Sequence, residues 1–156
     1  PAFWFWPNVD AGSDGTSKGI RVFREHTPSA RIHFFRNMQP EDFLRLIYNC
    51  RCLAGNSSVG IREGSFLGVP VVAANAGGVP EIVADGVDGF LCRPGCVADY
   101  VRHLESVLDR PALRESVIQA ARSKVEARFT LERVAEDFKR VVADVLPPAG
   151  PGAGAA

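Results

Sequence analysis

The sequence predicts an α/β fold in which a parallel sheet is covered by helices on both faces. Short apolar stretches of strand length alternate with segments of helical periodicity. The connections between them are short, so successive strands are expected to run parallel through helical crossovers. Glycine-rich loops follow three of the strands, at residues 8–15, 55–60 and 75–80. Such sheets bind ligands beyond the carboxyl ends of their strands, so these loops predict one ligand-binding edge.

The first half of the chain is expected to alternate strictly between strands and helices. The aromatic run at residues 3–6, stopped by Pro7, is typical of a strand buried on both faces. Pro40 suits the first position of a helix, and Glu41 and Asp42 suit its first turn. The predicted strands are residues 3–6, 32–35, 52–54 and 71–74, and helices are predicted through residues 18–23, from Pro40, and after loop 55–60.

The second half is expected to close the sheet. A short helix at residues 81–84, a turn and a strand at residues 90–92 precede three amphipathic helices. In the first of these helices, Val97, Tyr100, Val101, Leu104, Val107 and Leu108 form one apolar stripe. Thr130 is the expected N-cap of the third. Residues 147–156 contain only Pro, Gly and Ala and are expected to be disordered, so residues 1–146 are predicted to form one domain.

Composition excludes several classes of function. Lys and Arg together number 18 in the 156 residues, as do Asp and Glu, so no net field favours nucleic acid or an anionic membrane. No apolar run approaches the roughly 20 residues that span a bilayer. The chain has no signal peptide and begins abruptly, so we expect a fragment or excised domain of a larger cytoplasmic protein. Its four cysteines are expected to be reduced thiols rather than a zinc site.

The loop at residues 55–60 and the helix expected after it carry the main candidate site. Backbone N–H groups and the helix dipole at such a position face an anion. Ser57, Ser58 and Gly60 are the candidate diphosphate ligands, although the serines also suit a role as simple helix caps. Glu63 lies in the first helical turn, where it could accept both ribose hydroxyls or act only as a dipole-stabilising surface acid.

A second candidate is the loop at residues 75–80. Gly77 and Gly78 would allow a ligand to approach the backbone closely, and they equally suit a plain turn. The chain contains no Walker loop and no paired Cys and His nucleophile, and its three histidines are isolated in sequence. We therefore expect neither a metal nor a redox cofactor.

Residues 3–73 resemble the C-terminal half of hydrolysing UDP-N-acetylglucosamine 2-epimerases. The resemblance rests on FWPNVDAGSDGTSKGI, PEDFLRLIYNCRCL and above all GNSSVGIREGSFLGVPVV. It implies that Ser57, Ser58 and Glu63 hold the diphosphate and ribose of UDP. It also implies that three residues of the first loop line the same cleft, namely Asn8, Asp10 and Ser13.

Residues 75–146 resemble a different family, the retaining glycosyltransferases of family 4. The motifs are NAGGVPEIV, DGVDGFLCRPG and the three closing helices. Two departures stand out, because Gly55 occupies the position of that family's first paired glutamate and Cys96 a position that is commonly Asp. Both families share the GT-B architecture of two Rossmann-like domains, so the resemblance implies that this chain is the C-terminal half of a GT-B fold.

These resemblances lead to three functional hypotheses. The first is a UDP-N-acetylglucosamine 2-epimerase, an isomerase that eliminates UDP and whose acid and base lie in a missing N-terminal domain. The alternative is the donor-binding domain of a retaining family 4 glycosyltransferase. The third is a non-catalytic or chimeric nucleotide-binding module. For the two enzyme hypotheses the expected ligand is a UDP-sugar, with UDP-N-acetylglucosamine as the specific expectation. No cofactor is implied, and the isolated domain is expected to be inactive.

Overall fold

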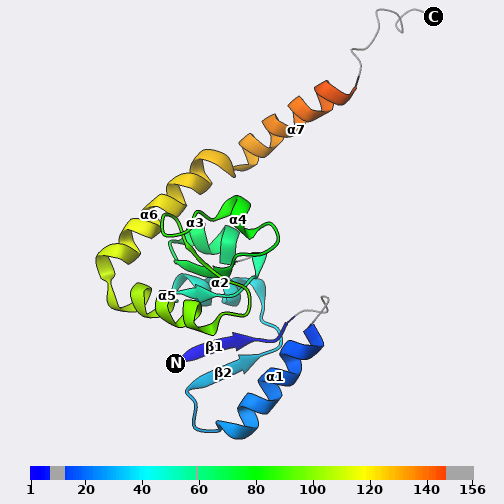
Figure 1. The fold of residues 1–156 in the computed structure, drawn as a ribbon. Helices are drawn as coiled ribbons and strands as arrows, with labels where there is room; N and C mark the ends of the chain where they lie inside the picture. Colours follow the sequence, from blue (N-terminus) through cyan, green and yellow to red (C-terminus); the bar gives the residue numbers. More distant parts are fainter. Residues whose placement is uncertain (8–12, 59, 147–156) are drawn as a thin grey trace, which may run out of the picture. The chain divides into compact units, whose positions relative to one another are not determined.

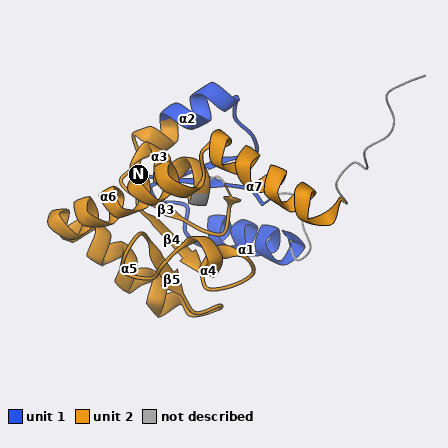
Figure 2. Ribbon diagram, turned by 90° about the horizontal axis from the view of Figure 1, so that it is seen from above, with its two compact units in different colours: residues 1–45 blue, residues 46–156 orange. Residues whose placement is uncertain are grey.

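The computed structural model describes residues 1–7, 13–58 and 60–146 of the chain. The chain divides into two compact units, Pro1–Arg45 and Leu46–Ala156 (Figure 2). Asn8, Asp10 and the tail at residues 147–156 lie outside the described residues. In chain order the elements are β1 (Ala2–Phe5), α1 (Ser13–His26), β2 (Ile32–Phe35), α2 (Pro40–Tyr48), β3 (Leu53–Ala54), the π-helix η1 (Gly60–Gly64), α3 (Ser65–Leu67), β4 (Val71–Ala74), α4 (Val79–Ile82), β5 (Phe90–Cys92), α5 (Val97–Asp109), α6 (Pro111–Arg128) and α7 (Leu131–Val145), as drawn in Figure 1.

The first unit is built on a parallel pair, β1 and β2, whose aromatic side chains stack across the strands. Trp4 stacks on Phe34, with ring centroids 6.1 Å apart, and also contacts Phe23 of α1 at 6.3 Å. On the other face Phe5 stacks on Phe35 at 5.5 Å and meets Phe43 of α2 edge-on at 5.0 Å. Aromatic rings therefore lie on both faces of β1. Phe3 and Trp4 are nevertheless 42 % and 40 % exposed, so the prediction that this strand is buried on both faces is wrong in the described structure.

The second unit contains a three-stranded parallel sheet in the order β3-β4-β5. The central strand β4 pairs with β3 on one edge and with β5 on the other. All four of its residues are buried, which agrees with a strand that has a continuous apolar sequence.

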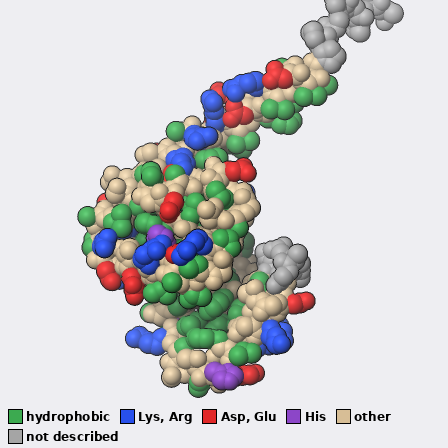
Figure 3. Space-filling model, in the orientation of Figure 1, with side chains coloured by type: hydrophobic (Ala, Val, Ile, Leu, Met, Phe, Trp, Pro, Cys, Tyr) green, Lys and Arg blue, Asp and Glu red, His purple; other side chains and the backbone are tan. Residues whose placement is uncertain are grey.

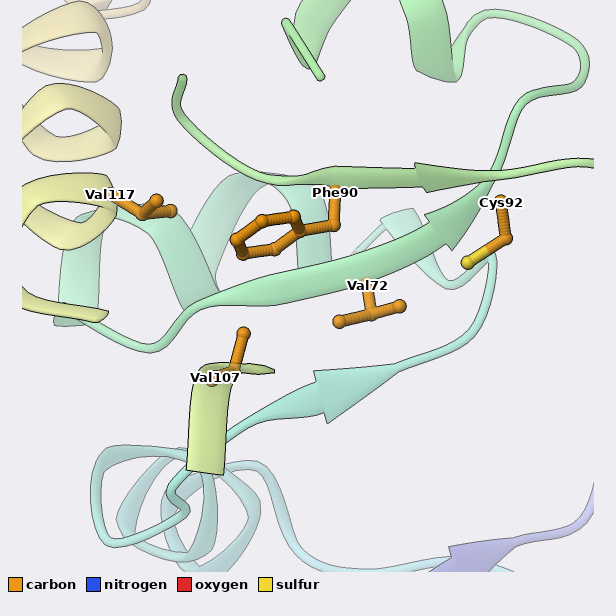
Figure 4. Close-up of a cluster of buried hydrophobic side chains, with 5 residues drawn as sticks. All are labelled: Val72, Phe90, Cys92, Val107 and Val117. Carbon is orange, nitrogen blue, oxygen red and sulfur yellow. The ribbon is translucent and has the colours of Figure 1, made fainter. Parts of the chain in front are cut away.

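Alternate residues of β4 enter two separate apolar clusters. Val71 and Ala73 pack with Val79, which belongs to α4, and with Val83, which directly follows that helix. Val72 points to the opposite cluster, which Figure 4 shows together with Phe90, Cys92, Val107 and Val117, contributed by β5, α5 and α6. Full burial of a valine side chain stabilises by about 1.5–3 kcal/mol relative to exposure. Helices thus cover both faces of the sheet, which confirms the predicted Rossmann-like α/β fold class.

Helix α4 begins earlier than predicted. It runs over Val79–Ile82 rather than residues 81–84, with Gly78 as N-cap and Pro80 in the first turn. Proline is accommodated there because the first-turn N–H groups have no partner within the helix.

A buried ion pair holds the end of α4 against α6. Asp88 is 5 % exposed; its carboxylate accepts a hydrogen bond from the Ala84 N–H at 2.8 Å and pairs with the Lys124 ammonium. The same ammonium donates to the Ile82 carbonyl at 2.8 Å. Because the buried charge has both a counterion and a hydrogen bond, this contact ties the loop between α4 and β5 to the helix layer.

The three closing helices differ in how much they bury. The predicted stripe of α5 is divided, because Val107 is buried and Tyr100 and Leu104 are half-buried, while Val97 and Val101 are 74 % and 48 % exposed. Thr130 caps α7 as predicted, its hydroxyl accepting from the Arg133 N–H at 3.3 Å. Nevertheless α7 buries none of its residues, and Figure 3 shows hydrophobic side chains at its surface beside charged ones.

Within the described part of the chain, no helix combines the length and the apolar character needed to cross a membrane. The single-domain boundary proposed for residues 1–146 stays a prediction.

The buried carboxylate of Asp99 connects the end of β5 to the start of α5. Its side chain is 4 % exposed and accepts from Arg93 Nε at 2.8 Å and from the Arg93 backbone N–H at 3.1 Å. Arg102 Nη2 lies 3.1 Å from its other oxygen. The hydrogen bonds from Arg93 hold the pKa of Asp99 well below its ordinary value.

We predict that this contact makes stability depend on acid pH. Because the folded-state pKa of Asp99 is depressed, its contribution is complete above about pH 4 and is lost as pH falls toward the folded pKa. In urea titrations, Asp99→Asn should therefore lower the free energy of unfolding at pH 7, and the gap from wild type should narrow below about pH 4. Asp109→Asn, at an exposed position of α5, is the control. A gap for Asp99→Asn that stays constant across this pH range would contradict the assignment.

Candidate functional site

The first predicted loop leaves the sheet at Gly55, directly after β3. Its φ of +137° lies in a region that favours glycine, so the chain turns out of the strand at this residue. The Gly55 N–H still donates to the Val72 carbonyl at 3.0 Å. The side chain of Asn56 accepts from the Ala74 N–H at 2.8 Å. Asn56 was not among the predicted site residues. Its side chain bonds to a strand that is distant in sequence, and no local sequence pattern indicates such a contact.

The segment after this loop is not the regular helix that the sequence predicts. It is the π-helix η1 followed by the single α-turn α3, which ends at Gly68 with φ of +77°. Gly64 lets this segment pack closely on β3, since a Cβ there would lie 2.6 Å from Leu53 Cδ1. The two elements are contiguous, so residues 60–67 form one helical segment that begins as a π-helix, and the dipole contribution to anion binding stays a prediction. Single π-turns are nevertheless frequent at functional sites.

Ser57 and Ser58 are both exposed at the start of this segment. The Ser57 carbonyl accepts a hydrogen bond from the buried Gly60 N–H at 3.0 Å, so this N–H is already hydrogen-bonded within the loop. The Ser58 hydroxyl accepts from Arg62 Nη2 at 3.4 Å. Arg62, whose side chain is 67 % exposed, was also missed from sequence; its position directly before Glu63 was the available signal.

Glu63 is half-buried and has an unusual carboxylate. Its Oε2 atom is buried and has no hydrogen-bond partner among the described residues; Arg62 Nε lies 3.9 Å away. A buried acceptor without a donor costs free energy, so such groups are rare in folded proteins. The arrangement leaves a carboxylate oxygen available to a donor that the chain does not itself supply.

The second predicted loop follows β4. The Asn75 N–H donates to the Cys92 carbonyl at 2.7 Å, so the loop starts in register with the end of β5. Gly77 has φ of +56°, Gly78 caps α4, and a Cβ at either position would meet no atom within 4 Å. Because β3 and β4 are neighbouring parallel strands, the loops that follow them leave the same edge of the sheet.

The remaining predicted loop, at residues 8–15, follows β1, which pairs with β2 in a separate two-stranded sheet. The described structure therefore gives a common sheet edge only for the loops after β3 and β4, and not for all three loops as predicted. Ser13 is the first residue of α1, in the other compact unit, and is half-buried. The described structure therefore brings together Ser57, Ser58, Glu63 and their loop neighbours, with Gly77 and Gly78 after the adjacent strand.

The cysteines are free thiols in this structure. Cys92 is buried, whereas Cys50, Cys52 and Cys96 are half-buried. Burial, with a smaller contribution from Cys50, raises the pKa of Cys52 to about 12, which disfavours the thiolate that binds zinc. Across residues 1–7, 13–58 and 60–146, no group of three or more His, Cys, Asp or Glu side chains is arranged to hold a metal.

Together, the parallel sheet, its two flanking helix layers and the small-residue loops at one edge define a Rossmann-like α/β domain. The chain belongs to the family of glycosyl transferases group 1, whose model matches residues 12–124.

Characterised relatives are transferases. The chain is 29% identical over 120 residues to the human alpha-1,3/1,6-mannosyltransferase ALG2, a match that covers 74% of this chain and 29% of ALG2. It is 31% identical over 122 residues to the D-inositol 3-phosphate glycosyltransferase of Corynebacterium aurimucosum, with coverages of 74% and 29%. The chain therefore spans less than a third of the length of these relatives.

Solved structures show the same fold. Anabaena HepE in complex with UDP-glucose superposes with a TM-score of 0.77 at 21% identity, covering 92% of this chain and 41% of HepE. The C-terminal domain of a glycosyl transferase group 1 protein, LpcC from Francisella tularensis, gives a TM-score of 0.62 at 17% identity, covering 76% and 64%. These likenesses support the prediction that the chain is the C-terminal half of a GT-B fold.

The comparisons correct the leading functional hypothesis. They support the transferase alternative, which the second half of the chain indicated, and give no support to an epimerase or isomerase.

We predict that Glu63 is retained at a cost in stability. Glu63→Met replaces the carboxylate with an apolar group of similar length, so it should raise the free energy of unfolding by about 0.5–1 kcal/mol in urea titrations. Glu81→Met, at an exposed position of α4, should give no such gain. Destabilisation by Glu63→Met would show that the carboxylate is satisfied in the folded protein.

Proposed function

We propose that this chain is the donor-binding domain of a glycosyltransferase and that the loops after β3 and β4 hold a UDP-sugar. The observation that carries the proposal is the buried Oε2 of Glu63, which has no donor among the described residues and belongs to the helical segment that follows the first loop. Membership of the glycosyl transferases group 1 family supports the reaction class. The UDP complex of HepE supports the choice of nucleotide.

The proposed diphosphate contacts come from the exposed side of the first loop. Ser57 and Ser58 supply hydroxyl groups, and the guanidinium of Arg62 adds a positive charge beside Ser58. Charged donors make the stronger hydrogen bonds to phosphate oxygens. We include Arg62 for this reason, beyond the residues that the sequence suggested.

The proposed ribose contact is the Glu63 carboxylate. A carboxylate has enough lone pairs to accept both hydroxyls of a ribose, and the unpartnered oxygen would gain the hydrogen bond that it lacks. Gly77 and Gly78 are proposed to let the sugar or phosphate approach the second loop, since no side chain stands there. Asn8, Asp10 and Ser13 remain proposed contacts on the first loop of the chain.

In the proposed reaction, the bond between the sugar C1 and UDP breaks and an acceptor takes the sugar. Negative charge develops on the departing diphosphate, so fixed donors at that position stabilise the transition state. Gly55 carries no carboxylate where family 4 enzymes have their first paired glutamate. The domain is therefore assigned donor binding and leaving-group stabilisation, with no general acid or base of its own.

We further propose that the whole protein contains a second, N-terminal Rossmann-like domain. The chain spans only 29% of ALG2 and 41% of HepE. Leu131 and Phe138 of α7 are 81 % and 67 % exposed, so this helix has apolar surface that another domain could cover. Half of the donor cleft would then be missing here, and the isolated chain should not transfer sugar.

Calorimetry with UDP tests the donor site. The 156-residue chain should bind UDP with a Kd no weaker than roughly millimolar, and Ser58→Ala and Glu63→Ala should each weaken binding by about 10-fold. Replacing UDP with 2′-deoxy-UDP should weaken wild-type binding but should have little effect on Glu63→Ala, because the ribose contact is already lost. Ser106→Ala, on α5, is the control. A folded wild-type chain that does not bind UDP at these concentrations would refute the proposal.

The reaction class can be tested on the full-length protein. Given UDP-N-acetylglucosamine, the first donor to try, it should turn over only when an acceptor is added, and the product should be a glycoside. Other UDP-sugars serve as alternative donors in the same assay. Release of free N-acetylmannosamine in the absence of acceptor would contradict the transferase assignment.

A further inference from the structure

Asn56 interrupts the parallel ladder between β3 and β4 in a specific way. The ladder proceeds through the Leu53 N–H, which donates to the Pro70 carbonyl at 2.9 Å, and the Gly55 N–H, which donates to Val72. In a regular parallel ladder the next acceptor would be the carbonyl of Gly55, receiving the Ala74 N–H. Here that N–H donates to the Asn56 side chain at 2.8 Å.

The side chain thus substitutes for the backbone at the last position of the ladder. Its acceptor must be the amide oxygen, because the partner is an N–H donor. The substitution allows the backbone to turn away at Gly55 while Ala74, which is 7 % exposed, keeps its hydrogen bond. A buried N–H left without a partner would otherwise be costly.

This hydrogen bond joins the bases of the two candidate loops. Asn56 is directly followed by Ser57 and Ser58, and Ala74 is directly followed by the loop that contains Gly77 and Gly78. The Asn75 N–H continues the connection to Cys92 at the end of β5. A shift of the first loop relative to the second must therefore break or stretch the Asn56 contact.

The Gly55 N–H bond to Val72 ends the ladder just before Asn56, and the hydrogen bonds described for the two residues after Asn56 are local. Ser57 is joined to Gly60, and Ser58 to Arg62, within the same segment. These bonds shape the loop but do not fix its position relative to β4. Among the described hydrogen bonds, the Asn56 contact is the one that links residues 56–58 to another strand.

We propose that Asn56 is a positioning residue that sets the distance between the two loops and so preorganises the donor site. The consequence for UDP rests on the proposed function, whereas the coupling of the loops does not. A ligand that contacts both loops binds more tightly when their separation is set in advance, because less conformational entropy is lost.

The test compares Asn56→Ala with Asn56→Asp. Alanine removes the acceptor, so amide hydrogen exchange at Ala74 should accelerate by about 10-fold or more, and NMR shifts should change at Gly77 and Gly78 as well as at Ser57 and Ser58. Aspartate keeps an oxygen in place and should restore the protection of Ala74. Unchanged exchange at Ala74, or shift changes confined to the first loop, would overturn the proposal.

A stability-matched control separates positioning from general loss of structure. Thr130→Ala removes the N-cap of α7, far along the chain from both loops, and should lower stability without altering their shifts or the affinity for UDP. Under conditions in which the variant is fully folded, Asn56→Ala should weaken UDP binding by about 10-fold. An Asn56→Ala variant with altered exchange but wild-type UDP affinity would refute the role in the donor site. If wild-type protein does not bind UDP, the proposed function fails, and the exchange and shift data still decide the loop coupling.

Discussion

The burial of β4 on both faces is the constraint on which the second unit depends. Val72 and Ala73 have no exposed surface, so each face of the strand must be covered and each backbone donor must be paired. The covering comes from α4 on one side and from α5 and α6 on the other. The pairing comes from β3 and β5, so the positions of these elements follow from one strand.

The candidate site is a consequence of how this pairing ends. Ligand loops must leave the sheet, yet the last buried N–H of β4 still requires an acceptor. Asn56 resolves the conflict with its side chain, which frees the backbone to form the loop that precedes η1. In contrast to the Ala74 N–H, which has its acceptor, the buried Oε2 of Glu63 has no hydrogen-bond partner among the described residues. Unsatisfied groups of this kind are typical of sites at which stability has been given up for binding.

The resemblance to two families arises because a local motif indicates a kind of ligand but does not indicate the reaction. The motif from Gly55 to Val72 predicts a nucleotide-sugar site, and the chain belongs to a family of glycosyl transferases. The contacts of these residues with UDP stay a prediction. The attribution of this segment to an epimerase was wrong, because the family model and the relatives that match the chain are transferases. Families that share a fold and a nucleotide-binding motif can still differ in the reaction that they catalyse.

The sequence by itself determined the alternation of strands and helices, the apolar β4, the Thr130 cap and the positions of Ser57, Ser58 and Glu63 on one short segment. Each depends on residues within a few positions of one another, so local periodicity and turn chemistry suffice. Only the tertiary structure decided that η1 replaces a regular helix, that the α5 stripe is divided and that Asn56 completes the ladder. Those outcomes depend on contacts between distant residues, such as Asn56 with Ala74, 18 positions away, which no local pattern encodes.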